Sequence, residues 1–154
     1  MIKLGKFTTV PLSGIIQYWN MTKDDIKKKY NGIGPENFWL NLIPRIFRNS
    51  VWLSDFGEIG YIHDCGYDKK PENISDEELM KYKYERDIEL RNNGNIIADY
   101  YYMHPGWFAS HFVSLKWLRK QRKERIQYYY ELCRDHGEEY FITGDKRKLP
   151  NKKP

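Results

Sequence analysis

The sequence lacks the features that stabilise small secreted proteins or anchor membrane proteins. Its two cysteines, Cys65 and Cys133, cannot form a disulfide framework; one bridge is possible, but free thiols are expected. Because no CxxC spacing occurs, a structural zinc site built on thiolates is not supported. The first residues lack the apolar run of a signal peptide, and no segment approaches the ~18 apolar residues that span a bilayer. We therefore expect a cytoplasmic protein, with export by another route left open.

Aromatic residues, by contrast, are abundant. They make up 16% of the 154 residues, and this share argues against a wholly disordered chain. A chain of this length is expected to bury one core without covalent staples. We predict a single domain over residues 1–144, followed by a basic, disordered tail over residues 145–154.

Capping residues predict a mainly α-helical protein with little room for a sheet. Residues 21–30 are predicted to form a short helix, with Thr22 as its cap, acids in its first turn and lysines in its last. A second helix is expected over residues 57–69. Ser75 and Glu78 form a capping-box pattern, so a third helix is predicted to begin there and to stop at Asn93-Gly94.

A long last helix is predicted from about Trp107 to Cys133, after a break at residues 104–106 (His-Pro-Gly). Apolar residues recur there at intervals typical of a helix with one buried face. The positions assigned to that face are Phe108, Phe112, Leu115, Leu118, Ile126 and Tyr129.

Positive charge is concentrated toward the C-terminus. Of the net charge of +5, residues 116–134 alone supply seven Lys or Arg against two Glu. This pattern predicts an anionic partner for that end of the chain, although a solvated helix face with a basic tail explains it equally well. The residues proposed to face such a partner are Lys116, Arg119, Lys120, Arg122 and Lys123.

The first candidate for chemistry is the stretch that contains His63, Asp64 and Tyr67. Residues four apart share a helix face, so His63 and Tyr67 point the same way while Asp64 points to a neighbouring face. Such a helix can present a histidine to a water and a carboxylate to a cation beside it. Taken alone, this pattern is more often an ordinary helix segment than a site.

The second candidate is the segment Tyr30-Asn31-Gly32-Ile33-Gly34, which follows the first helix. Glycines let a chain turn so that successive carbonyls converge, and a hard cation such as Ca²⁺ prefers convergent oxygen ligands. A plain turn after a helix would explain the same residues.

The third candidate is Asp87, on the helix that begins near Ser75. A histidine that acts as a general base at one ring nitrogen needs an acceptor to orient the other. A buried carboxylate on a facing antiparallel helix meets that need, whereas Glu85 and Glu89 are expected to be solvated.

Together these three elements resemble the phospholipase A2 superfamily. The resemblance covers about Tyr30 to Leu90, and it is closest to compact, disulfide-free prokaryotic and phage-borne members. It implies a pair of antiparallel helices with a glycine-rich calcium loop, to which this chain adds a long basic C-terminal helix. It also implies calcium-dependent hydrolysis of the sn-2 ester of phospholipids at a membrane surface.

The resemblance also implies residue roles. Carbonyls of Tyr30, Gly32 and Gly34, with the Asp64 carboxylate, would hold Ca²⁺, and the Gly34 amide would stabilise the oxyanion. His63 would take a proton from the attacking water, Asp87 would orient His63, and Tyr67 would hydrogen-bond Asp87. Gly66, inside the helix, departs from good helix propensity, and close packing against the facing helix would explain it.

Other classes of protein compete with this hypothesis. The HD phosphohydrolases need a further histidine before their His-Asp pair, and no histidine precedes His63. His104, His111 and His136 have no recognised metal-ligand spacing and are assigned to caps and packing. The alternatives kept are a catalytically inactive relative and a non-enzymatic basic module that binds an anionic membrane or, less favoured, nucleic acid.

Overall fold

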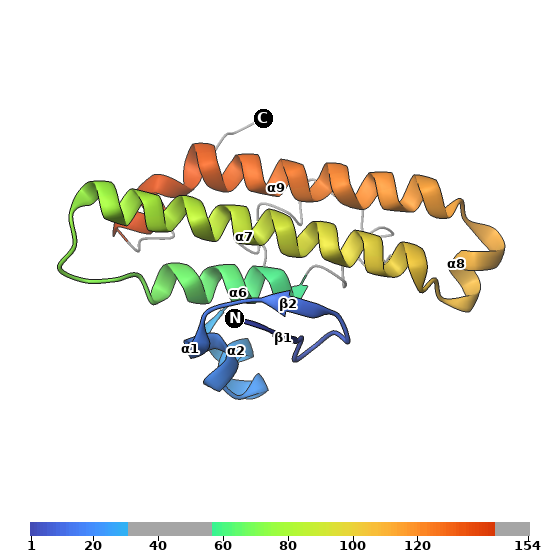
Figure 1. The fold of residues 1–154 in the computed structure, drawn as a ribbon, viewed down its shortest axis with the longest axis horizontal. Coiled ribbons are helices and arrows are strands. Elements are labelled where there is room, and N and C mark those ends of the chain that lie inside the picture. Colours follow the sequence, from blue (N-terminus) through green and yellow to red (C-terminus); the bar gives the residue numbers. More distant parts are fainter. Residues whose placement is uncertain (31–56, 144–154) are drawn as a thin grey trace.

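The computed structural model describes residues 1–30 and 57–143, which form a mainly α-helical protein (Figure 1). Three long helices, α6 (Gly57–Asp68), α7 (Asp76–Met103) and α9 (Leu115–Thr143), run in alternating directions, and α7 packs against both of the others. The short helix α8 (Trp107–Phe112) connects α7 to α9 at one end of this layer. The predicted tail over residues 145–154 lies outside the described residues.

The N-terminal residues form a small hairpin and two short helices beside α6. Strands β1 (Ile2–Leu4) and β2 (Pro11–Ser13) pair antiparallel, with Lys3 opposite Leu12. The chain continues through α1 (Ile16–Asn20) and α2 (Lys23–Lys29). Within the described parts of the chain the hairpin is the only sheet, so the mainly α prediction is confirmed.

The predicted helix starts are confirmed by their capping contacts. The Thr22 hydroxyl accepts a hydrogen bond from the Asp25 amide at the start of α2. At the start of α7, Ser75 and Glu78 form the complete capping box. Each contact satisfies an amide that the first turn of a helix leaves without an intrahelical partner.

The prediction that the third helix stops at Asn93-Gly94 is wrong, because α7 continues to Met103. Asn93 and Gly94 pack α7 against other elements and do not end the helix. The Asn93 side chain accepts from the Ser13 amide at 2.8 Å and donates to the Ser13 carbonyl at 2.7 Å, so it fastens β2 to α7. Gly94 lies close against α9, since a Cβ there would be 2.1 Å from Cγ1 of Ile126.

The predicted single helix from Trp107 to Cys133 is also wrong. The chain is extended at Val113, which separates α8 from α9, and α9 continues to Thr143. The Ser114 hydroxyl accepts from the Trp117 amide and so starts the new helix. Because of this break, Phe112 is exposed instead of buried, whereas Leu118, Ile126 and Tyr129 are buried as predicted.

Glu58, at the start of α6, holds the N-terminal hairpin loop. Its buried carboxylate accepts hydrogen bonds from the amides of Lys6, Phe7 and Thr8 and from the Tyr18 hydroxyl. A buried carboxylate is stable only when donors replace its water, and here four donors do so.

The core lies between this N-terminal unit and the three long helices. Strand β2 and helices α1, α2, α6, α7 and α9 contribute to it, together with Val10 from the hairpin loop. Its buried apolar residues are Val10, Leu12, Tyr18, Trp19, Ile26, Tyr30, Ile59, Ile62, Cys65, Leu90, Ile97, Ile126 and Tyr129.

Replacing Gly94 with Ala is expected to lower the free energy of unfolding by about 1–3 kcal/mol, because the new methyl group overlaps Ile126 and forces α7 and α9 apart. Chemical denaturation measures this change. The matched control is Gly57→Ala, where a Cβ meets no atom within 4 Å, and its effect should stay within about 1 kcal/mol. Equal effects of the two substitutions would contradict the close approach.

Candidate functional site

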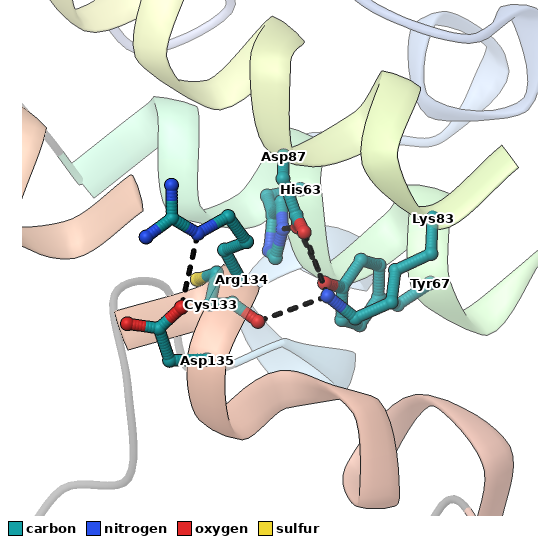
Figure 2. Close-up of polar contacts among 7 residues, drawn as sticks. All are labelled: His63, Tyr67, Lys83, Asp87, Cys133, Arg134 and Asp135. Atoms are coloured by element: carbon teal, nitrogen blue, oxygen red, sulfur yellow. Dashed lines mark hydrogen bonds and ion pairs between the residues drawn. The ribbon is translucent and has the colours of Figure 1, made fainter. Parts of the chain in front are cut away.

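The centre of the site is the carboxylate of Asp87, which is fully buried on α7. Its Oδ1 accepts a hydrogen bond from the Tyr67 hydroxyl and lies 2.9 Å from His63 Nε2. Its Oδ2 accepts from Lys83 Nζ at 2.7 Å. Figure 2 shows these side chains converging from α6 and α7, with the backbone of α9 beside them.

The hydrogen bond to Asp87 fixes the direction of the His63 ring. Since an ionised carboxylate only accepts, Nε2 is the donor and the other nitrogen, Nδ1, is left as an acceptor in the neutral ring. Among residues 1–30 and 57–143, the hydrogen bond of the His63 ring is the one from Nε2 to Asp87. The contacts that the resemblance implies for Asp87, His63 and Tyr67 are therefore present.

Tyr67 remains a proton donor in this site. Burial, followed by the negative charge of Asp87, raises the pKa of the Tyr67 hydroxyl well above its ordinary value. Its ring contacts the His63 ring at 4.2 Å between centroids and the Phe141 ring of α9 at 4.8 Å. Tyr67 thus connects all three long helices around the carboxylate.

Lys83 is the residue of this site that the sequence reasoning missed. Its fully buried ammonium donates to Asp87 and, at 2.9 Å, to the backbone carbonyl of Cys133 on α9. The available signal was its position four residues before Asp87, which places the two side chains on one helix face. No sequence pattern predicted that Lys83 would also bind the backbone carbonyl of Cys133.

Ionic partners also determine the charge state of Asp87. Burial alone would raise its pKa, but the hydrogen bond and charge of His63, with the hydrogen bonds of Lys83 and Tyr67, bring its pKa below the usual range. The carboxylate is therefore ionised at neutral pH, as an orienting acceptor must be.

The Cys133 thiol lies near the same groups. One ligand atom each from His63, Asp87 and Cys133 lie within 4.8 Å of one another, a set that suits a soft metal ion. Both oxygens of Asp87 already accept hydrogen bonds, however, and burial together with the charge of Asp87 raises the pKa of the Cys133 thiol to about 12. The cluster is accordingly built as a hydrogen-bonded network. Both cysteines are free, as predicted.

The proposed calcium ligands are described only in part, because Gly32 and Gly34 lie outside the described residues. Asp64 is half-buried on α6, and its charge is among the causes that raise the pKa of Cys133. Tyr30 ends α2 in an extended conformation, and its hydroxyl donates to Asp68 at 3.0 Å. Since Asp68 is one helical turn after Asp64, the end of α2 is held beside the face of α6 that carries Asp64.

Asp68 and Lys70, near the end of α6, both contact other helices. Asp68 accepts from Lys29 at 2.7 Å as well as from Tyr30, which fastens α2 to α6. Lys70 donates to the carbonyls of Phe141 and Ile142, near the C-terminal end of α9. A cation there complements the negative end of the helix dipole.

Gly66 has the packing role predicted for it. A Cβ at this position would lie 2.9 Å from Cδ of Arg86, so the Arg86 side chain crosses α6 directly over the glycine. Glu89, expected to be solvated, is half-buried and accepts hydrogen bonds from Arg86 and Ser13.

The predicted basic surface on α9 is smaller than the sequence suggests. Arg122 is buried, with its guanidinium over the Tyr101 ring, so its assignment to a surface is wrong. Arg119 and Lys123 both pair with Asp99, at 2.7 and 2.9 Å. Lys116 and Lys120 are exposed. His104 and His111 bond to backbone carbonyls near helix ends, as expected for caps.

Comparisons with models of protein families, with curated proteins and with solved structures give no match. The resemblance to the phospholipase A2 superfamily therefore stays a prediction from the sequence. No helix among residues 1–30 and 57–143 is long and apolar enough to cross a bilayer.

Replacing Lys83 with Met is expected to lower the free energy of unfolding by about 3 kcal/mol, since it leaves a buried charge with one partner fewer. The double variant with Asp87→Asn should lose less than the sum of the two single variants. Lys70→Met is the matched control, because Lys70 also binds carbonyls of α9 but does not touch Asp87; its effect should stay within about 1 kcal/mol. Additive effects of Lys83 and Asp87 would contradict the pairing.

Because folding lowers the pKa of Asp87, its ionised form stabilises the protein above the unfolded pKa of about 4, and this contribution disappears as pH falls through the folded pKa. The difference in unfolding free energy between the wild type and Asp87→Asn should be constant from about pH 7 to 5 and shrink below about pH 4. Urea denaturation over this range measures it. A difference that grows toward acid would contradict the lowered pKa.

Proposed function

We propose that the protein is a phospholipase A2-like esterase that hydrolyses the sn-2 ester of phospholipids with bound calcium. The observation that carries the proposal is the buried Asp87 carboxylate, which binds His63 Nε2 and leaves Nδ1 able to accept a proton. A neutral histidine held in this way is a general base.

His63 acts on a water placed beside Nδ1. The ring takes one proton from this water as the water oxygen attacks the ester carbonyl, and it returns the proton to the leaving alcohol oxygen when the ester bond breaks. Asp87 stabilises the positive ring that forms between these steps. Lys83 and Tyr67 keep the Asp87 carboxylate in place and ionised.

The donors that can be described suit a calcium ion. The Asp64 carboxylate and the Tyr30 carbonyl are hard oxygen ligands, and the Tyr30 ring is anchored one turn from Asp64. With the carbonyls of Gly32 and Gly34, they would hold an ion that polarises the ester carbonyl. The amide of Gly34 is the proposed oxyanion donor.

The alternative is a catalytically inactive relative or a basic binding module. The site geometry suits an inactive relative as well as an active one, so activity is the deciding measurement. Nucleic acid binding has less support than the sequence alone gives it, because Arg122 is buried and Arg119 and Lys123 both pair with Asp99.

The decisive experiment is release of fatty acid from phospholipid vesicles with calcium, with a chelator, and with His63→Gln. We expect chelation to abolish release and His63→Gln to reduce it by about 10²–10⁴-fold, as for loss of a general base. The matched control is His104→Gln, an exposed histidine that bonds the Tyr100 carbonyl at the end of α7, and it should retain wild-type activity.

Activity that survives both chelation and His63→Gln would rule out the mechanism. If no hydrolysis occurs but calcium raises the melting temperature and Asp64→Asn removes the effect, the protein is the inactive relative. If calcium has no effect and DNA binding with a steep salt dependence is observed, the basic module is correct.

A further inference from the structure

The connection between α7 and α9 exposes large apolar side chains at one end of the molecule. Met103 is 67% exposed, Trp107 is 70% exposed and Phe112 is 66% exposed. The Trp107 and Phe112 rings lie 6.0 Å apart between centroids, so they form one cluster instead of scattered contacts. We call these three residues the apolar tip.

The backbone conformation of α8 and its flanking residues exposes the side chains of the apolar tip. α8 holds its own helical turn, and the chain is extended on either side of it, at Gly106 and Val113. The Trp107 carbonyl accepts hydrogen bonds from Ser110 and His111. Trp107 and Phe112 are thus presented by an ordered helical turn that projects beyond the ends of the long helices (Figure 1).

The charged residues that follow the apolar tip along the chain are basic up to Lys123, and the next one, Glu124, lies 3.7 Å from Lys120. Residues 100–123 include five Lys or Arg and no Asp or Glu. Asp99, just before this segment, is already bound to Arg119 and Lys123. Lys116 and Lys120 are exposed in the first two turns of α9, about 6 Å apart along its axis.

This order of groups favours a lipid surface over other partners. Trp, Phe and Met lie at the apex, and the exposed lysines lie farther along α9. A bilayer offers the same order in depth, with acyl chains beneath the phosphates, and tryptophan favours the boundary between them. An aromatic platform for nucleic acid would instead interleave rings and cations along one groove.

We infer that the apolar tip, with Lys116 and Lys120, docks the protein on membranes that contain anionic phospholipids. The rings enter the headgroup region, and the two ammonium groups contact lipid phosphates. The surface lies at the end of the helical layer opposite the α6–α7 connection, so it is distinct from the His63 site. The inference does not depend on ester hydrolysis.

The test is co-sedimentation of the full chain with vesicles of ether-linked phospholipids in the presence of a calcium chelator. Ether lipids have no ester to hydrolyse, and the chelator removes calcium, so failure of the proposed enzyme function leaves this result unaffected. We expect binding to vesicles rich in phosphatidylglycerol, weaker binding to pure phosphatidylcholine, and a loss of affinity as salt increases.

The double variant Trp107→Ser/Phe112→Ser should bind at least about tenfold more weakly, since each buried ring contributes on the order of a tenfold factor. Lys116→Glu/Lys120→Glu should lose the preference for anionic lipid. The matched control is Ile2→Ser/Leu4→Ser, which removes equally exposed apolar groups from β1 and should bind like the wild type. Circular dichroism checks that each variant is folded.

Three outcomes would overturn the inference. The first is that the Trp107/Phe112 variant binds vesicles as tightly as the wild type. The second is that the wild type sediments as a dimer and this variant as a monomer without vesicles, which makes the apolar tip an interface between copies. The third is that duplex DNA, and not anionic lipid, binds at Lys116 and Lys120.

Discussion

The buried negative charge of Asp87 is the constraint on which the rest of the structure depends. A carboxylate without water is stable only if donors surround it, and here the donors come from α6 and from α7 itself. Lys83 extends the network to the backbone of α9. The same charge that requires this packing also orients His63, so the stability of the fold and the geometry of the site have one origin.

Much of this site could be predicted from sequence because its members obey helical spacing. His63 and Tyr67 are four residues apart on α6, and the capping box at Ser75 sets the start of α7 and hence the face that Asp87 occupies. What could not be predicted came from distant segments. Cys133 lies 46 residues after Asp87, and no local pattern states which turn of α9 will face Lys83.

The wrong predictions have a common cause. Each took a short sequence pattern as evidence for local structure, whereas contacts with distant segments determine what those residues do. Asn93-Gly94 has the composition of a helix end, yet it serves β2 and α9. Glu89 was expected to be solvated but is half-buried and bonds Arg86 and Ser13. Conversely, Phe112 matched the helical apolar pattern but is exposed, because α8 ends there and the chain is extended at Val113. Intrinsic preference is a weak guide wherever segments pack closely.

The hydrogen bonds between Asn93 and Ser13 of β2 have a mechanical consequence for α7. Asn93 follows Asp87 by six residues, so the two side chains leave α7 in directions about 120° apart around its axis. The Asn93 side chain is held by the Ser13 backbone and the Asp87 side chain by His63 and Tyr67 of α6. A helix that is held in two directions around its axis cannot rotate freely about that axis. The hairpin of β1 and β2 therefore limits the rotation of α7 about its axis, and α7 carries the Asp87 carboxylate that orients His63.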